Sequence, residues 1–464
     1  MMSFIYKMIC LTLLNATLLG GTAVQAQEIN RKVSEKLLYK VDMKAMVSNS
    51  FSVSNDRKRF ACRIWGGKKQ MAVIDGIIGK TYDSVTYPIF SPDSRRVAYA
   101  AKTDSVWFLM VDNKVELSLK ADSSIRVVLF SPDSKSIAYV VNDGHKNYCV
   151  FGNSKGRSYD GIDENSINFS TDSRKIAYTA SKGKKQLIVF DGQEGMLFDH
   201  VGFPVINSTG NRIAYRAVDS SHSFVVVDNL KSQPYDDIKS ILFSPDGKRY
   251  AYIAARSRKQ FVVVDGMEGE KADVAHSICF SPDGTGFAYG IDLMNGKEGQ
   301  YHFTIVNGQR KGPYLTVVEG SIFFSSDSKH LVYKAELDDT FMMVMDGKNG
   351  KDYGDILQLT AVFSPDNQRF AYAADNNSKR FVIIDGKEHE PFNDILFITF
   401  STDSKRLVYT ARTGEKELAV LDGNKGGSYS SIMGGGGIVF DSPDSFHYLA
   451  MKGDEIYLIE ERID

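Results

Sequence analysis

The sequence predicts an all-β protein, a β-propeller built from eleven four-stranded antiparallel repeats. Three observations lead to this fold class. One ten-residue motif recurs along nearly the whole chain, Asp-Gly or Asn-Gly turns recur at a regular distance after it, and no amphipathic helix of useful length is present. A repeat of about 40 residues with four short strands is the unit of a propeller blade.

The motif is clearest at residues 243–252, which read Phe-Ser-Pro-Asp-Gly-Lys-Arg-Tyr-Ala-Tyr. Its aspartate, or the residue equivalent to it, marks each copy, and successive marks lie 37–44 residues apart. The marks fall at positions 56, 93, 133, 172, 209, 246, 283, 327, 366, 403 and 444. Eleven copies predict eleven blades.

Each copy is read as four strands and their turns. The first strand ends at Phe-Ser, and residues 244–247 form a type I turn, because proline presets φ at its second position. The second strand covers residues 249–254 and the third covers residues 261–264. Asp265-Gly266 then supplies the positive φ angles of a tight hairpin. A weaker fourth strand contains Tyr-Asp or a relic of it, as at Tyr235-Asp236.

Eleven blades exceed the usual four to eight of a closed propeller. We therefore expect two consecutive rings, residues 27–229 with five repeats and residues 230–464 with six. One large ring is the alternative. Residues 36–41 form a spare strand before the first repeat, and the last repeat ends after its third strand. The N-terminal strand therefore completes either the last blade of one ring or the first of two rings.

Residues 1–26 are predicted to be a signal peptide. Lys7 precedes an apolar stretch at residues 8–20, and Val24-Gln25-Ala26 provides a cleavage site. No later stretch has the ~18–20 apolar residues of a membrane span. We expect a protein exported to the periplasm or the extracellular space. Its 56 basic and 57 acidic residues argue against nucleic acid as a partner.

The Ser-Pro-Asp-Gly-Lys-Arg-x-Ala-Tyr pattern resembles the WD-repeat-like blades of the TolB family and of the propeller domains in prolyl-oligopeptidase-type proteins. The resemblance covers essentially the whole mature chain. It implies the propeller fold, and the TolB likeness suggests the periplasm. Such blades serve transport, binding and enzyme-capping roles alike, so no single activity follows. No α/β-hydrolase-like region flanks the blades, so the hydrolase activity of the peptidases is not expected.

The candidate catalytic motifs have structural explanations. Residues 152–156 match the Gly-x-Ser-x-Gly nucleophile elbow, but they lie where other repeats have a hairpin turn. The motif aspartates recur in nearly every blade, whereas an active site would rest on residues that differ between blades. Residues 434–437, a run of four glycines, lack the ending of a phosphate loop and are expected to form a connection or bulge.

The metal-ligating residue types are scattered. No His-x-x-x-His pair occurs, and the acidic clusters lack the spacing of a calcium loop. The cysteines of the mature chain lie in different repeats, which predicts buried free thiols. We therefore assign no catalytic, metal or cofactor residue. The residues in question are His145, His200, His222, His276, His302, His330, His389, His447, Cys62, Cys149 and Cys279.

Two surface features remain. Basic loops follow the second strands, and in a propeller they share one face, although acids are interleaved with them. The hairpin at residues 291–301 is the longest irregularity and is a possible contact site. We expect a non-catalytic propeller that binds or scaffolds a protein, peptide or glycan in the cell envelope. The alternative is an enzyme, a lyase or metal-dependent hydrolase, with its site on the propeller axis. The oligomeric state stays open.

Overall fold

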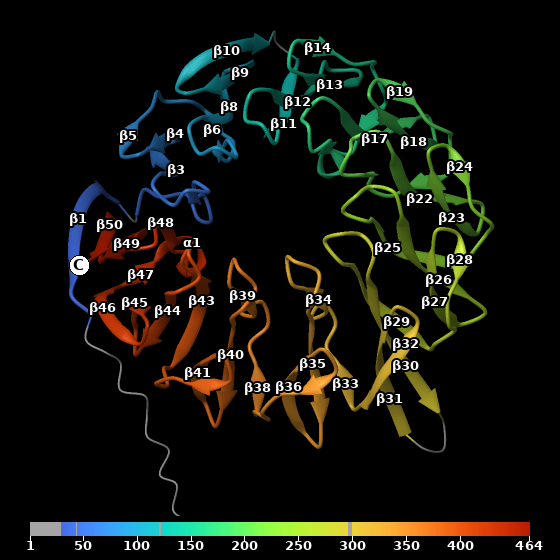
Figure 1. Ribbon diagram of the computed structural model, residues 1–464. Helices are drawn as coiled ribbons and strands as arrows, with labels where there is room; N and C mark the ends of the chain where they lie inside the picture. The colour runs from blue at the N-terminus through green and yellow to red at the C-terminus, as the bar shows by residue number, and fades with distance from the viewer. Residues whose placement is uncertain (1–28, 43, 120–121, 296–298) are drawn as a thin grey trace, which may run out of the picture.

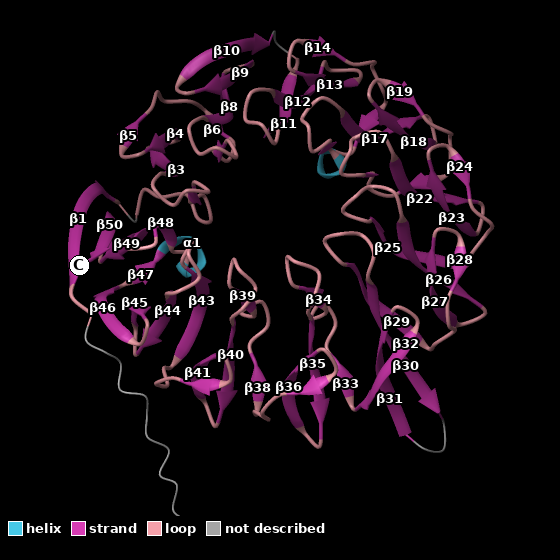
Figure 2. Ribbon diagram, viewed as in Figure 1, coloured by secondary structure: helices cyan, strands magenta, loops and turns pink. Residues whose placement is uncertain are grey.

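The computed structural model describes residues 29–42, 44–119, 122–295 and 299–464. These residues form eleven separate antiparallel sheets arranged as one ring (Figure 1). Each sheet is a blade that runs from an innermost strand to an outermost strand at the rim. Strands dominate, and two short helical segments stand out, η1 (Glu164–Ser166) and α1 (Met433–Gly436) (Figure 2). The all-β propeller of eleven four-stranded repeats is confirmed. The predicted signal peptide, residues 1–26, lies outside the described residues.

The strands of the first four blades follow the chain in order from the innermost strand outward. Blade 1 contains β2 (Ser52–Val53), β3 (Phe60–Gly66), β4 (Lys69–Ile74) and β5 (Ile77–Ile78). Blade 2 contains β6 (Ser84–Val85), β7 (Ile89–Phe90), β8 (Val97–Thr103), β9 (Val106–Val111) and β10 (Lys114–Leu119). Blade 3 contains β11 (Ser124–Phe130), β12 (Ile137–Asn142), β13 (Asn147–Phe151) and β14 (Ser154–Lys155). Blade 4 contains β15 (Gly161–Ile162), β16 (Asn168–Phe169), β17 (Ile176–Lys182), β18 (Lys185–Phe190) and β19 (Gln193–Glu194).

Blades 5 to 8 repeat the same plan. Blade 5 contains β20 (His200–Val201), β21 (Val205–Ile206), β22 (Ile213–Asp219), β23 (His222–Val227) and β24 (Leu230–Lys231). Blade 6 contains β25 (Asp237–Phe243), β26 (Tyr250–Arg256), β27 (Lys259–Val264) and β28 (Met267–Glu268). Blade 7 contains β29 (Val274–Phe280), β30 (Phe287–Asn295), β31 (Gly299–Val306) and β32 (Gln309–Tyr314). Blade 8 contains β33 (Thr316–Val317), β34 (Phe323–Phe324), β35 (Leu331–Leu337), β36 (Thr340–Met345) and β37 (Lys348–Asn349).

The last three blades complete the ring. Blade 9 contains β38 (Asp355–Ile356), β39 (Val362–Phe363), β40 (Phe370–Asn376), β41 (Lys379–Ile384) and β42 (Lys387–Glu388). Blade 10 contains β43 (Asp394–Phe400), β44 (Leu407–Thr413), β45 (Lys416–Leu421) and β46 (Asn424–Tyr429). Blade 11 contains β47 (Ser431–Ile432), β48 (Val439–Ser442), β49 (Ser445–Lys452) and β50 (Glu455–Ile463), and its outermost strand is β1 (Arg31–Lys40).

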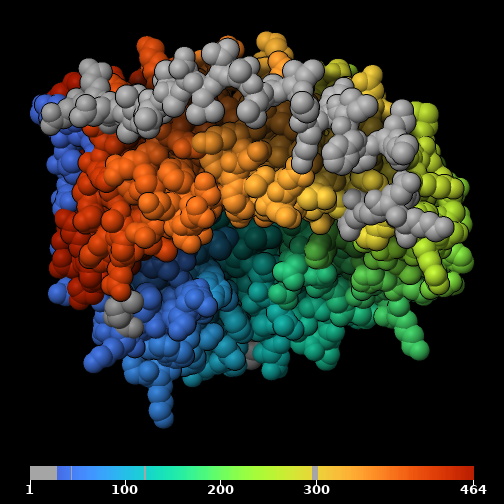
Figure 3. All heavy atoms as spheres, turned by 90° about the horizontal axis from the view of Figure 1, so that it is seen from below, coloured from blue at the N-terminus to red at the C-terminus, as the bar shows by residue number. Residues whose placement is uncertain are grey.

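The ring closes through the N-terminal strand. β1 pairs antiparallel with β50, from Arg31 opposite Ile463 to Lys40 opposite Glu455. In the edge-on view the blue N-terminal and red C-terminal parts of the chain lie side by side (Figure 3). The alternative left open by the sequence, one large ring, is therefore the observed arrangement.

The two-ring division into residues 27–229 and 230–464 is corrected accordingly. A boundary at residue 229 would fall inside the hairpin that pairs β23 with β24 in blade 5. Blade 5 is also bonded to blade 6 in the usual way, since Arg212 Nη1 donates to the Lys248 carbonyl at 2.7 Å. Blades 5 and 6 therefore belong to one continuous ring.

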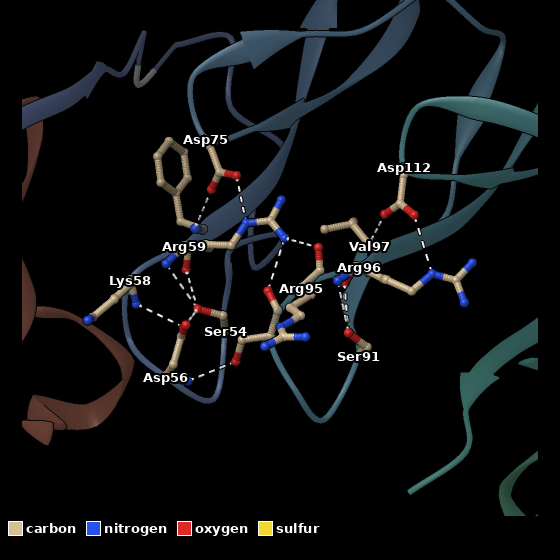
Figure 4. A network of polar contacts seen from close by, with 12 residues as sticks. Ser54, Asp56, Lys58, Arg59, Asp75, Ser91, Arg95, Arg96, Val97 and Asp112 are labelled. Carbon is tan, nitrogen blue, oxygen red and sulfur yellow. Dashed lines mark hydrogen bonds and ion pairs between the residues drawn. The ribbon is translucent and has the colours of Figure 1, made fainter. Parts of the chain in front are cut away.

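The Ser-Pro-Asp turns join neighbouring blades (Figure 4). The Ser94 hydroxyl of blade 2 accepts from the Asp56 amide of blade 1 at 2.9 Å. Arg59 donates through Nε to Asp75 at 2.8 Å and through Nη1 to the Arg95 carbonyl at 2.6 Å. This turn therefore satisfies its own backbone and holds the next blade, and the same link from an amide to a serine hydroxyl recurs between other neighbouring blades.

The hydrophobic core is divided among the interfaces between blades. One cluster, for example, combines Ala61 and Ile74 of blade 1 with Val97, Tyr99 and Met110 of blade 2. A four-stranded blade has two apolar faces, and each face is buried only against a neighbour. The space between two blades is thus the natural place for a defect in packing.

The glycine run forms a bulge in the innermost strand of blade 11, as expected. It includes α1, where Gly434 and Gly435 have φ of 64° and 74°. A Cβ atom on Gly434 would lie 1.9 Å from Arg57 Nη1, and one on Gly437 would lie 2.7 Å from Arg57 Cζ. The glycines are needed because the Arg57 side chain of blade 1 packs directly on them.

Candidate functional site

A groove with a volume of about 700 Å³ lies between blades 2 and 3. We call it the 2/3 groove. One wall comes from β9 and β10, the other from β12, β13 and β14. Its apolar lining residues are Leu109, Leu117, Leu119, Ile137, Val141 and Val150, its aromatic ones are Tyr139 and Tyr148, and its charged ones are Arg96, Glu116, Lys135 and Lys155. A volume of this size is typical of a ligand site.

Two residues of blade 2 at this groove differ from those of most blades. Six of the other blades have glycine at the first position, and in four of them the glycine lies close to the tyrosine hydroxyl of the next blade. A Cβ atom on Gly156, for example, would lie 3.1 Å from Tyr178 Oη. Glu116 stands at that place in blade 2.

The second substitution removes an aromatic residue. In blade 1, Tyr82 forms an isolated β-bridge with Gln70 of the third strand, and the Tyr82 side chain is buried. Its equivalent in blade 2 is Leu119, opposite Trp107. Leucine fills less of the space between two blades than tyrosine does, although blade 6 has the still smaller Ala272 at this place and the tyrosine of the next blade, Tyr289, is buried.

The repeated tyrosine of the second strand is less buried at this groove than in the other blades. Ten blades have tyrosine at this position, and nine of these residues are buried. Tyr139 is the exception and is half-buried. Burial raises the pKa of Tyr139, with smaller contributions from Tyr148 and Glu116. The phenol is therefore neutral near pH 7 and its hydroxyl faces a cavity.

Cations surround the mouth of the groove. The Lys155 ammonium lies 3.8 Å from the centre of the Tyr148 ring. Arg96 pairs with Asp112 at 3.3 Å and lies 5.5 Å from the centre of the Phe130 ring. The groove thus combines an apolar floor, two phenols and a basic rim interrupted by one carboxylate.

The Gly-x-Ser-x-Gly match belongs to the same part of the chain. Ser154 begins β14, directly after a turn in which Gly152 has φ of 56°. The chain continues into β14 and then crosses to β15, so the strand-to-helix turn of a nucleophile elbow is not formed here.

The histidines divide into paired and isolated ones. His276 and His302 both contact Asp292, while His447 contacts Asp441 at 2.7 Å and the Asp56 carbonyl at 2.5 Å. Within the described ranges, no group of three or more His, Cys, Asp or Glu side chains has a geometry suited to a metal ion. Sequence reasoning missed the convergence on Asp292, although two histidines in one repeat were a signal for it.

The basic loops are largely neutralised by neighbouring carboxylates. Lys69 pairs with Asp83 at 2.8 Å, and Lys259 pairs with Asp273 at 2.6 Å. Further pairs of the same kind are Lys182–Glu194, Lys185–Asp199, Arg256–Glu268 and Arg412–Glu417. These loops therefore do not form a ring of unpaired positive charge.

Residues 291–301 include the ends of β30 and β31, which pair as far as Asn295 opposite Gly299. Met294, one of these residues, is 55% exposed. Their role as a contact site stays a prediction. The helical segments of the described chain have three and four residues, far below the length of a membrane span.

Comparison with known proteins yields no family. No protein-family model matches the sequence, and no curated protein matches it. Solved structures share its fold. The β-propeller domain of the trilobed protease from Pyrococcus furiosus is 14% identical, with 57% of this chain and 94% of that chain covered and a TM-score of 0.30.

Two further structures are TolB from Acinetobacter baumannii and an oligogalacturonate lyase in complex with manganese. TolB is 15% identical over 55% of this chain and 75% of its own, with a TM-score of 0.26. The lyase is 11% identical over 67% and 96%, with a TM-score of 0.27. The likeness to TolB and other propellers is a likeness of fold, and no activity is transferred from it.

Proposed function

We propose that this protein is an exported β-propeller of the cell envelope that binds a protein or peptide partner in the 2/3 groove. The observation that carries the proposal is Tyr139, the one repeated tyrosine left half-buried, at the wall of a cavity of about 700 Å³. A regular blade interface would bury it. The incomplete burial of Tyr139 coincides with the groove, since Tyr139 is one of its lining residues.

The chemistry of the groove selects the partner. Its floor accepts an apolar or aromatic side chain, and the phenols of Tyr139 and Tyr148 offer hydrogen bonds. Arg96, Lys135 and Lys155 at the rim favour an acidic group nearby. The chain itself places aromatic-acidic dipeptides between blades elsewhere, as at Tyr235-Asp236. We therefore expect a segment with an aromatic residue next to Asp or Glu.

Binding is tested with a displayed library of random peptides. The library is panned on the wild-type protein and counter-selected on Leu119→Tyr, which fills the groove. Enriched peptides with an aromatic residue beside an acid would support the proposal. Failure to enrich any such peptide would refute it. An array of oligosaccharides is probed in parallel with the wild-type protein and with Leu119→Tyr. An oligosaccharide that binds the wild-type protein but not Leu119→Tyr would identify the ligand as a glycan.

A matched pair of variants locates the site. Lys155 and Lys231 occupy equivalent positions in blades 3 and 5, and each ammonium lies over an aromatic ring, Tyr148 and Phe224. We expect Lys155→Ala to weaken binding of a selected peptide about 5- to 30-fold, which corresponds to a cation–π contact and a charge contact of about 1–2 kcal/mol. Lys231→Ala should leave the affinity unchanged.

Export is tested separately. The protein is expressed with its own N-terminus in a diderm bacterium, and the periplasmic fraction is analysed by N-terminal sequencing. We expect a mature chain that begins at Gln27, after Ala26. A protein that retains residues 1–26 in the cytoplasmic fraction would contradict this part of the proposal.

A further inference from the structure

Blade 7 contains a polar cluster that its neighbour lacks. Blades 6 and 7 have innermost strands of equal length, β25 and β29, with the same bulge. Four positions that pair across the first three strands carry different residues in the two blades. In blade 7 the side chains at these four positions lie next to one another. The residues of blade 6 are Lys239, Ile253, Ala255 and Gln260, and their equivalents in blade 7 are His276, Gly290, Asp292 and His302.

The four changes fit one another. A Cβ atom on Gly290 would lie 2.2 Å from His276 Cε1. The ring therefore needs glycine beside it, and Ile253 in blade 6 would exclude it. His276 and His302 are 5% and 6% exposed. Both face the Asp292 carboxylate, whose Oδ1 lies 3.4 Å from His276 Nε2 and 2.5 Å from His302 Nδ1.

The cluster continues to Ser277, the next residue on β29. Its Oγ lies 2.9 Å from His276 Nδ1 and accepts from the Gly320 amide of blade 8 at 2.7 Å. The nearby Asp292 carboxylate, 3.4 Å from His276 Nε2, favours a proton on that nitrogen, and Nδ1 can then accept from the serine. The hydroxyl, imidazole and carboxylate thus form a chain of neighbouring groups.

The environment of the chain favours this protonation pattern. Burial raises the pKa of Asp292, but contacts with His276 and His302 outweigh it and hold the pKa below its ordinary value. The carboxylate is therefore ionised at neutral pH. Ser277 is the partly exposed end of the chain, on a bulge of the innermost strand with φ of 55°.

We propose that Ser277 is an activated nucleophile for acyl esters, with His276 as its general base and Asp292 as the group that orients the imidazole. A nucleophile within hydrogen-bond reach of a base, itself held by a third group, is the arrangement that activates serine. Ser277 Oγ forms a bond to the acyl carbon while its proton passes to His276 Nδ1. The bond to the leaving alcohol breaks, and the alcohol takes that proton.

Water then completes the cycle. It attacks the acyl-serine, gives its proton to His276, and the carboxylic acid leaves as Ser277 recovers its proton. His302 does not touch the substrate and is a positioning residue for Asp292. This inference is independent of the 2/3 groove. It is a serine-based form of the enzyme alternative considered from the sequence.

Ser240 provides a matched internal control. It occupies the same bulge in blade 6, has φ of 48°, and is exposed, but Lys239 stands where blade 7 has the base. The wild-type protein is treated with a fluorophosphonate, which forms a serine–phosphorus bond with loss of fluoride, and adducts at both serines are quantified by mass spectrometry. We expect labelling of Ser277 to be at least about 10-fold faster than that of Ser240. Equal labelling, or none at Ser277, would overturn the proposal.

This comparison takes place within one folded molecule, so it does not depend on variants. A second measurement follows hydrolysis of p-nitrophenyl acetate. Release of p-nitrophenolate should fall to the background rate in Ser277→Ala and stay unchanged in Ser240→Ala. Release that persists in Ser277→Ala would overturn the acyl-transfer step.

Discussion

Arg31 and Glu461 form a buried ion pair between the first and the last strand of the propeller. Arg31 Nη1 lies 3.1 Å from Glu461 Oε2, and the two side chains are 7% and 0% exposed. Tyr448 Oη also donates to Glu461 at 2.7 Å. Burial raises the pKa of Glu461, and the nearby Arg31 charge opposes that rise. The strand that closes the ring is thus held by a charge pair inside blade 11.

Arg31→Ala is expected to destabilise the protein by about 3–5 kcal/mol, because it leaves a buried carboxylate without its partner. Urea unfolding followed by circular dichroism measures this loss. Lys32→Ala is the control, since Lys32 pairs with Asp464 at the surface and such pairs contribute only about 0–1 kcal/mol. Equal effects of the two substitutions would contradict the role assigned to the buried pair.

Leu119→Tyr is expected to stabilise the protein by about 0.5–2 kcal/mol, because it fills the 2/3 groove with the residue type that several other blades have at this place, such as Tyr82 and Tyr235. The reverse change, Tyr82→Leu, should destabilise by about 1–3 kcal/mol because Tyr82 is buried between blades 1 and 2. Thermal unfolding of both variants tests the pair. A loss of stability in Leu119→Tyr would show that the groove is not a packing defect.

The lowered pKa values of the turn aspartates predict that the protein loses stability in acid. The Ser325 hydroxyl and the Lys329 amide hold the pKa of Asp327 at about 2, against an ordinary value of 3.8. The pKa of Asp93, Asp246 and Asp403 is lowered in the same way, first by a serine hydroxyl. A lowered pKa adds stability that is complete above the ordinary value and is lost as pH falls through the folded one.

The expected acid unfolding therefore lies between about pH 4 and pH 2. Ser325→Ala removes the hydroxyl that stabilises the Asp327 carboxylate, so its unfolding midpoint should move to higher pH. Circular dichroism during an acid titration measures the midpoint. A midpoint that stays in place in Ser325→Ala would mean that this turn does not contribute to acid stability.

The thiols should be unreactive in the folded protein. Cys62 and Cys149 are free and buried, and burial raises their pKa to about 11 and about 12. At about pH 8 neither forms the thiolate that a disulfide reagent needs. Ellman's reagent should modify both only after denaturation in guanidinium. Rapid modification of either residue in the native state would contradict this burial.

The sequence predicted the local elements well because each is decided by neighbouring residues. Asp265-Gly266 forms its hairpin turn with φ of 52° and 83°, and the Ser244 hydroxyl bonds Asp246 at 2.6 Å inside the predicted turn. The predicted buried thiols are observed for Cys62 and Cys149, whereas Cys279 is partly exposed. The candidate sites were not predicted from the sequence. Each depends on a contact between different strands, Glu116 with Tyr139 in one and His276 with Asp292 in the other.

The sequence by itself determined the blade and the number of blades. Turn residues specify short-range backbone angles, and the alternation of apolar residues specifies strands, so a repeat of about 40 residues is readable without the fold. Whether eleven blades close as one ring or two was decided only by the tertiary structure. Closure depends on the packing of successive blades against one another and on the pairing of β1 with β50. That pairing joins residues more than 400 positions apart, and no local pattern encodes it.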